Sequence, residues 1–139
     1  MSAEENKVAG RRFFDEMLAK GAWSLADKLL LPNVVMHHPS SPMPITGRDA
    51  VIGLLTAFRA GFPDLQMKSE DAFGERDRVV VRWAMSGTHT ANLFGIPPTG
   101  KAVRVAGISI LRFLDGKVAE DWVAEDSLGL MKQLGVVNV

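Results

Sequence analysis

The spacing of apolar residues predicts helices in the first part of the chain. The first apolar stripe repeats every four residues, at Ala9, Phe13 and Met17, which is the spacing of one face of an amphipathic helix. Gly21 should end this helix. A second, short helix is predicted from Ser24 to Leu30, where Pro32 stops it. A third follows Gly47, with an apolar face made by Val51, Leu54, Leu55, Phe58 and Phe62.

The pattern changes to alternation in the second part, and this change predicts strands. Four strands are expected, over residues 65–73, 78–88, 101–114 and 118–125. Asp115-Gly116 joins the last two as a tight hairpin turn. A short strand at Val34-Val35 precedes them all. Helices followed by long strands with short turns favour an α+β fold, in which the helices pack on one face of an antiparallel sheet.

Alternation also predicts which side chains face the helices. Arg104 and Arg112 share one face of the strand over 101–114, and an unpaired buried guanidinium is costly. The opposite face should therefore be the inner one, and it carries Val103, Val105, Gly107, Ser109, Leu111 and Phe113. By the same reasoning the inner residues of the preceding strand are Val81, Trp83 and Met85, followed by His89 if the alternation is unbroken.

Two further strands place carboxylates among these inner positions. Ala119, Asp121, Val123 and Glu125 share one face of the last strand. In the strand over 65–73, Asp71 has the inward parity of Leu65, Met67 and Phe73. Asp126-Ser127 is expected to cap a final helical turn.

Composition narrows the range of functions. The 139 residues predict one domain, and 47% hydrophobic residues support a real core. Sixteen basic and sixteen acidic residues give a net charge of zero, so no electrostatic field recruits nucleic acid or an anionic membrane. No apolar run approaches the length of a membrane span, and the first residues lack a signal-peptide core. We therefore expect a cytoplasmic protein.

The same composition argues against metal and cofactor sites. The chain has no cysteine, which excludes disulfides, thiol nucleophiles and cysteine metal ligands. His37 and His38 are adjacent, so they point to opposite sides of an extended segment, and no histidine–carboxylate cluster has ligand spacing. Phosphate-binding glycine motifs are absent. We expect no metal and no cofactor.

Three segments carry a family resemblance. They are GTHTANLFGIPPTGKAVRVAG over residues 87–107, RFLDGKVAEDW over 112–122 and LGLMKQLG over 128–135. The chain resembles the SnoaL-like polyketide cyclases, within the nuclear transport factor two-like and ketosteroid isomerase-like superfamily. The resemblance implies that the sheet curls into a half-open cone (an α+β barrel) whose mouth is an apolar pocket. It also implies a homodimer in which two sheets pack back to back.

The resemblance implies a location for the catalytic pair. Relatives of this type carry an acid/base aspartate near the end of the last strand and an assisting histidine on the neighbouring strand. Counted from the Asp115-Gly116 turn, these positions fall on Val123 and Ser109, neither of which can exchange a proton in the same way. Asp121 lies two residues earlier on the same face and is the best substitute. His37 and His89 are the histidines that could assist it.

Each of these residues also has a structural interpretation. Asp121 could be a solvated strand-end carboxylate, His37 a backbone-bonded histidine, His89 a rim residue and Asp71 an edge-strand hydrogen-bonding residue. The side chains that we expect to contact a ligand are Phe58, Asp71, Trp83, Met85, Ser109, Leu111 and Val123, several of which would serve equally as core.

Two functions follow from these alternatives. The first is a cofactor-free enzyme that moves protons on a small, largely apolar carbonyl compound by aldol cyclisation, isomerisation, dehydration or epoxide opening. The second is a binding protein for a small hydrophobic molecule that has lost the acid/base pair. Val123 and Ser109 favour the binding protein, whereas Asp121 favours the enzyme.

Overall fold

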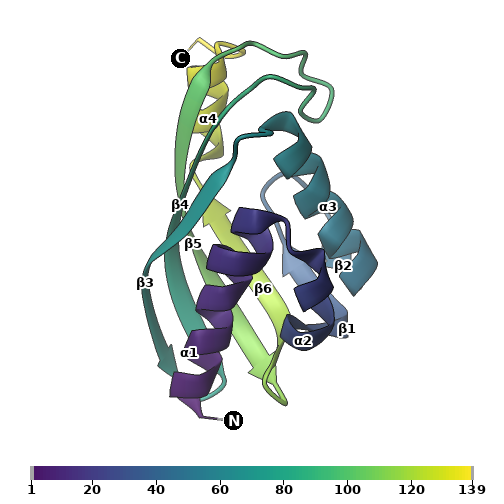
Figure 1. Cartoon of the computed structure of the whole chain (residues 1–139), viewed down its shortest axis with the longest axis vertical. Helices are drawn as coiled ribbons and strands as arrows, with labels where there is room; N and C mark the ends of the chain where they lie inside the picture. The colour runs from purple at the N-terminus through teal and green to yellow at the C-terminus, as the bar shows by residue number, and fades with distance from the viewer. Residues whose placement is uncertain (1, 139) are drawn as a thin grey trace.

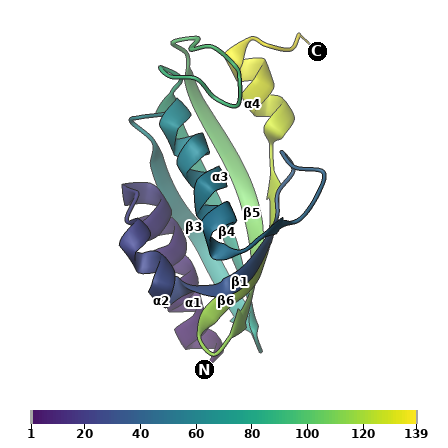
Figure 2. The ribbon, with the colours of Figure 1, turned by 90° about the vertical axis from the view of Figure 1, so that its right-hand side faces the viewer.

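The computed structural model describes residues 2–138. A long, curved, six-stranded sheet carries helices α1, α2 and α3 on one face, while α4 lies at the end where the chain terminates (Figures 1 and 2). The helices are α1 (Ala3–Arg12), α2 (Ala26–Leu29), α3 (Arg48–Gly61) and α4 (Ser127–Leu134). The strands are β1 (Leu30–His37), β2 (Ile45–Thr46), β3 (Gln66–Glu75), β4 (Arg78–Thr88), β5 (Ala102–Leu114) and β6 (Lys117–Glu125).

The sheet has the strand order β2-β1-β6-β5-β4-β3. The order confirms the predicted α+β fold, with its curved sheet and its N-terminal helices. One part of the prediction was wrong: β1 runs parallel to β6, so the sheet is mixed rather than antiparallel. A parallel neighbour needs a long crossover connection. Here everything between β1 and β6 serves as that connection, which local alternation could not reveal.

The first helix begins at a capping box and continues as a π-helical segment, η1 (Phe13–Leu18). Ser2 Oγ accepts a hydrogen bond from the Glu5 backbone N–H at 3.1 Å, and the Glu5 carboxylate accepts one from the Ser2 backbone N–H. The pair satisfies two donors that a helix N-terminus leaves free. Gly21, with φ of 63°, ends this helical region as predicted, because glycine adopts the left-handed conformation without strain.

Strand β1 begins earlier than the sequence predicts. The predicted helix continues to Leu30, but α2 ends at Leu29 and β1 starts at Leu30. A 3-10 turn, η2 (Trp23–Leu25), precedes α2. Pro32 is exposed in the part of β1 where pairing with β6 is interrupted. Proline has no N–H for a sheet ladder, so it fits at such a gap.

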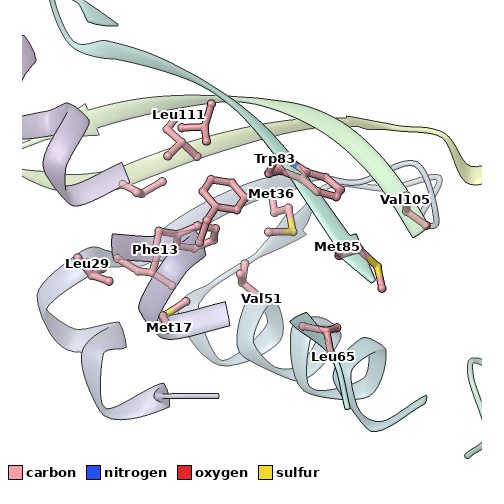
Figure 3. Close-up of a cluster of buried hydrophobic side chains, with 14 of the residues drawn as sticks. Phe13, Met17, Leu29, Met36, Val51, Leu65, Trp83, Met85, Val105 and Leu111 are labelled. Atoms are coloured by element: carbon pink, nitrogen blue, oxygen red, sulfur yellow. The ribbon is translucent and has the colours of Figure 1, made fainter. Parts of the chain in front are cut away.

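The core lies between the sheet and the helices. All six predicted inner residues of β5 are buried, while Arg104, Ile108 and Ile110 on the other face are exposed. Figure 3 shows Trp83 and Met85 of β4, with Val105 and Leu111 of β5, across the core from Val51 of α3. The buried set also includes Phe13, Met17, Leu29, Met36 and Leu65. No helix between residues 2 and 138 has both the length and the apolar character needed to cross a membrane.

The outer face of the sheet has no helix over it (Figure 2). Phe73, Ile108 and Ile110 are 62%, 47% and 37% exposed there, which is unusually apolar for an antiparallel surface that meets water. Arg82 and Arg104 stand among them. This face therefore combines apolar and charged side chains.

Candidate active site

A cavity opens between the inner face of the sheet and the helices. Its walls are almost wholly apolar, with contributions from η1, α3 and the inner faces of β1, β4 and β6. Five polar or charged side chains reach it: His38, Arg59, Ser109, Asp121 and Glu125. A few converging polar groups in an apolar cavity are typical of a small-molecule site.

Asp121 is the most deeply buried ionisable group of the cavity. Its position on the inner face follows from the alternation of β6, and Leu111 and Met36 are its partners on the two neighbouring strands. The residue is 2% exposed, and no atom of residues 2–138 forms a hydrogen bond with Oδ1. Burial raises the pKa of this carboxyl from 3.8 to about 7, because a charged carboxylate loses its hydration there.

The second polar group is a pair that the sequence analysis missed. His38 Nε2 lies 2.8 Å from Glu125 Oε1, and the two side chains are only 9% and 5% exposed. His38 Nδ1 accepts a hydrogen bond from the Ser40 backbone N–H at 3.1 Å. In the neutral ring, the proton must therefore sit on Nε2, the nitrogen nearest Glu125. The Ser40 N–H thus selects the tautomer, and the Glu125 carboxylate lies against the Nε2 side of the ring.

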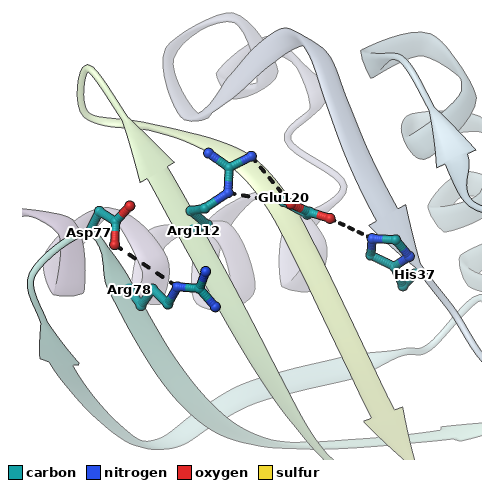
Figure 4. A network of polar contacts seen from close by, with 5 residues as sticks. All are labelled: His37, Asp77, Arg78, Arg112 and Glu120. Carbon is teal, nitrogen blue, oxygen red and sulfur yellow. Dashed lines mark hydrogen bonds and ion pairs between the residues drawn. The ribbon is translucent and has the colours of Figure 1, made fainter.

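His37 was one of the two histidines that could assist Asp121, but the structure places it away from the cavity. It lies on the outer face, where Nε2 donates to Glu120 Oε2 at 2.6 Å (Figure 4). The His37 ring also stacks on that of Trp122, with 5.5 Å between the ring centroids. The His37 hydrogen bond, with help from Arg112, lowers the pKa of Glu120. Because Met36 faces the core, alternation places His37 outside and His38 inside. Continuing the alternation of Val34 and Met36 to the next inner position would have identified His38, but the predicted strand ended at Val35, whereas β1 continues to His37.

His89 is fully buried but does not line the cavity. Its Nδ1 accepts the Thr99 backbone N–H at 3.1 Å, and its ring lies 5.7 Å from that of Phe62. The Gly100 N–H also donates to the His89 carbonyl. His89 therefore closes the base of the loop between β4 and β5 instead of assisting Asp121.

Trp83 and Ser109 form one wall of the cavity together. The indole Nε1–H donates to Ser109 Oγ at 3.0 Å, and both side chains are buried. Gly107 is the cross-strand partner of Trp83, and a Cβ at Gly107 would lie 2.2 Å from the indole. Glycine is required here because the indole lies directly over the β5 backbone. Ser109 also pairs with Val123, after a shift of register between Arg112 and Phe113.

The other predicted ligand contacts are divided by the structure. Phe58, Met85 and Val123 line the cavity, whereas Leu111 is buried in the core beside it. Asp71 is exposed on the other face, contrary to its predicted inward parity. The cause is a β-bulge: the pairing of β3 with β4 skips Glu70, and one extra residue reverses every later side chain. Among residues 2–138, no group of three metal-ligating side chains converges.

The fold and the cavity together define a class of cone-shaped α+β proteins that hold a small molecule between sheet and helices. The model of the SnoaL-like polyketide cyclase family matches residues 9–134. The chain therefore belongs to the SnoaL-like polyketide cyclase family, as its three motif segments predict.

Individual relatives agree with this assignment. The chain is 30% identical over 109 residues to the aklanonic acid methyl ester cyclase DauD of Streptomyces sp. (strain C5), an alignment that covers 76% of this chain and 64% of the relative. The cyclase DnrD of Streptomyces peucetius, named for the same methyl ester, is equally similar, with 76% and 71% covered. This chain thus spans less than two thirds of the first relative.

A solved structure shows the same architecture. A protein described as a candidate SnoaL-like polyketide cyclase from Jannaschia sp. CCS1 superposes with a TM-score of 0.88 at 25% identity. The superposition covers 98% of this chain and 95% of the other. The predicted membership of the nuclear transport factor two-like superfamily is confirmed at the level of the fold.

Proposed function

We propose that this protein is an acid/base enzyme of the cyclase or isomerase type, which acts on a small, largely apolar carbonyl compound and needs no cofactor. The single observation that carries the proposal is Asp121, a carboxyl buried in an apolar cavity with its pKa raised to about 7. A group with this pKa can both accept and return a proton near neutral pH. Family membership and the cyclase relatives support the same reaction type.

The proposed reaction begins and ends at Asp121. The carboxylate takes a proton from the carbon next to the substrate carbonyl, and the electron pair of that C–H bond forms an enolate. In an aldol cyclisation, the enolate carbon then attacks a second carbonyl and forms a C–C bond. The resulting alkoxide takes its proton back from Asp121, which is again a carboxylate. In an isomerisation, the proton returns to a different carbon instead.

Two neighbouring groups fit supporting roles. Ser109 Oγ accepts the Trp83 indole N–H, so its own hydrogen remains free to donate to a substrate oxygen. His38, held by Glu125 at 2.8 Å, supplies a polar ring of fixed direction on the same side of the cavity. We assign to these groups the orientation of the carbonyl and to Asp121 the transfer of the proton.

The competing function is binding without reaction. It is favoured by Val123 and Ser109, which occupy the positions where the family resemblance implies the acid/base pair. In that case the cavity would hold a hydrophobic ligand, and the raised pKa of Asp121 would be a by-product of burial.

A proton-exchange experiment separates the two functions. The protein is incubated in deuterated buffer with a panel of β-diketones and aryl ketones, while nuclear magnetic resonance follows exchange at the carbon next to the carbonyl. We expect catalysed exchange by the wild type and a loss of about a hundredfold or more in Asp121→Asn. Asp71→Asn is the matched control, because this aspartate is exposed on the opposite face. Binding without any catalysed exchange would establish the binding protein instead.

We propose separately that the chain forms a homodimer through the outer face of the sheet. That face exposes Phe73, Ile108 and Ile110, a larger apolar surface than an isolated sheet normally presents to water. Arg78 lies 5.2 Å above the Trp122 ring, and Arg112 contacts Glu120 at 3.3 Å. Such charged and aromatic groups around an apolar centre are typical of a protein–protein interface.

A further inference from the structure

One cation faces the cavity from the helical side. Arg59 lies near the end of α3 and lines the cavity beside Phe58, Leu55 and Leu18. The other polar groups, Ser109, Asp121 and Glu125 on the sheet and His38 just after β1, belong to the opposite side. The cavity therefore has a positively charged group on one wall and the proton-transferring group on the other.

The position of the Arg59 guanidinium is fixed by the backbone around it. Nη1 donates to the Leu18 carbonyl at 3.0 Å and to the Ala19 carbonyl at 2.9 Å. The side chain crosses Gly21, where an added Cβ would come within 3.0 Å of Nε. A guanidinium that is already held in place loses little conformational entropy when it binds a ligand.

The charge of Arg59 has no counterion in the part of the chain that the structure describes. Arg48 and Arg112, by contrast, contact the carboxylates of Asp27 and Glu120. The partners of Arg59 are neutral carbonyls, and both are bound by Nη1. Within residues 2–138, no group accepts a hydrogen bond from Nη2 or Nε of Arg59. A partly buried cation without a counterion favours an anionic ligand group.

The carboxylates of the cavity do not cancel this charge. Glu125 is paired with His38. Asp121 is protonated in most molecules below neutral pH, because burial raises its pKa to about 7. Among the described residues, no carboxylate of the cavity contacts Arg59, so its positive charge stands alone on the α3 side.

We propose that Arg59 binds a carboxylate of the substrate, so that the cavity selects hydrophobic keto acids over neutral ketones of the same shape. The carboxylate lies against α3 and the reacting carbon points toward Asp121 on β6. Arginine suits this role because its planar fork matches the two oxygens of a carboxylate. This inference rests on the proposed function for the identity of the reacting end, but the recognition of the anion can be measured without any reaction.

The test compares a carboxylate with its neutral isostere. Naphthoate and naphthamide have nearly the same shape, and only the first carries a charge at about pH 6, where Asp121 is mostly protonated. Affinities are measured by calorimetry, and the indole N–H signal of Trp83 reports whether the ligand enters the cavity. We expect the wild type to bind the carboxylate about tenfold more tightly, a modest factor because Arg59 is partly exposed to solvent.

Three variants distinguish recognition from structural support. Arg59→Met should lose about tenfold in affinity for the carboxylate and keep its affinity for the amide, whereas Arg59→Lys should retain part of the preference. Arg48→Met is the matched control, since Arg48 also lies on α3 and donates to a backbone carbonyl, that of Leu30, but outside the cavity. It should leave both affinities unchanged.

The results also separate this inference from the proposed enzyme. Equal binding of the two ligands by the wild type, binding of neither, or an equal loss for both in Arg59→Met would overturn the role of Arg59. None of these outcomes bears on proton exchange by Asp121. Conversely, a preference for the carboxylate without any catalysed exchange would leave the anion site standing in a binding protein.

Discussion

Replacement of Asp121 by asparagine should stabilise the fold, and the gain should grow as the pH rises. The unfolded chain holds the Asp121 proton with a pKa near 3.8, whereas burial raises the pKa to about 7 in the folded protein. Between these two values the folded state binds more protons than the unfolded state. The contribution of Asp121 to the free energy of unfolding is therefore fully present at low pH and is lost as the pH rises through about 7. Asparagine has no proton to lose and escapes this penalty.

The magnitude follows from the two pKa values. Each pH unit between them costs the wild type about 1.4 kcal/mol, and the loss stops above the folded pKa. From about pH 5 to about pH 8, the wild type should therefore lose roughly 3 kcal/mol relative to Asp121→Asn. The comparison across pH cancels the constant cost of burying the asparagine amide. A loss of this size is a large part of the stability of an ordinary domain.

Urea unfolding at a series of pH values and one protein concentration measures the effect. Asp71→Asn is the control, because Asp71 is exposed and its replacement should shift stability by less than about 0.5 kcal/mol at every pH. A stability difference between Asp121→Asn and wild type that stays constant across this range would refute the argument. It would mean that water or a bound ligand solvates the carboxylate. Loss of activity together with the gain in stability would show that the carboxyl is retained for function.

Two further predictions concern the sheet. Gly107→Ala places a Cβ 2.2 Å from the Trp83 indole and should lower the free energy of unfolding by about 2 kcal/mol. It should also break the Trp83–Ser109 hydrogen bond, which the indole N–H signal reports. Gly53→Ala is the control: a Cβ there meets open space, so the variant should be slightly more stable than wild type. If the two variants prove equally stable, the close approach of indole and backbone is wrong. Trp122→Glu should dissociate the proposed dimer in light scattering and leave ligand binding in the cavity intact, while a monomeric wild type at micromolar concentration would reject the dimer.

The strands that form the wall of the site could be predicted from the sequence with little error. β4 was predicted with its observed ends, and β5 and β6 to within one residue at their N-terminal ends. The inward direction of Asp121, Trp83 and Ser109 was predicted as well. Alternation is a local property of an extended backbone, and the tight Asp115-Gly116 turn fixes where it restarts. Local rules therefore suffice wherever a strand is long and unbroken.

Predictions failed where a side chain's direction depended on another strand. The bulge at Glu70 turns Asp71 outward, and nothing in the residues before it marks the extra position. The directions of His37 and His38 are the reverse of the predicted ones, because β1 pairs with β6 and continues to His37. A shift of one residue in register exchanges the two faces of a strand. The prediction therefore assigned the site to His37, which lies outside, instead of His38, which lines the cavity.

The chemistry of the site was decided by tertiary structure. The pattern of β6 places Asp121 on the inner face, but only the packing of β1, β5 and the helices around it removes its water and raises its pKa to about 7. His38 and Glu125 come together, 2.8 Å apart, because β1 and β6 are neighbours. Arg59 meets the cavity because α3 crosses the sheet. For Asp121, Trp83 and Ser109, the sequence alone determined the inward direction, since alternation along β4, β5 and β6 depends on local geometry. Their pKa values and partners depend on what surrounds them, which only the assembled fold brings together.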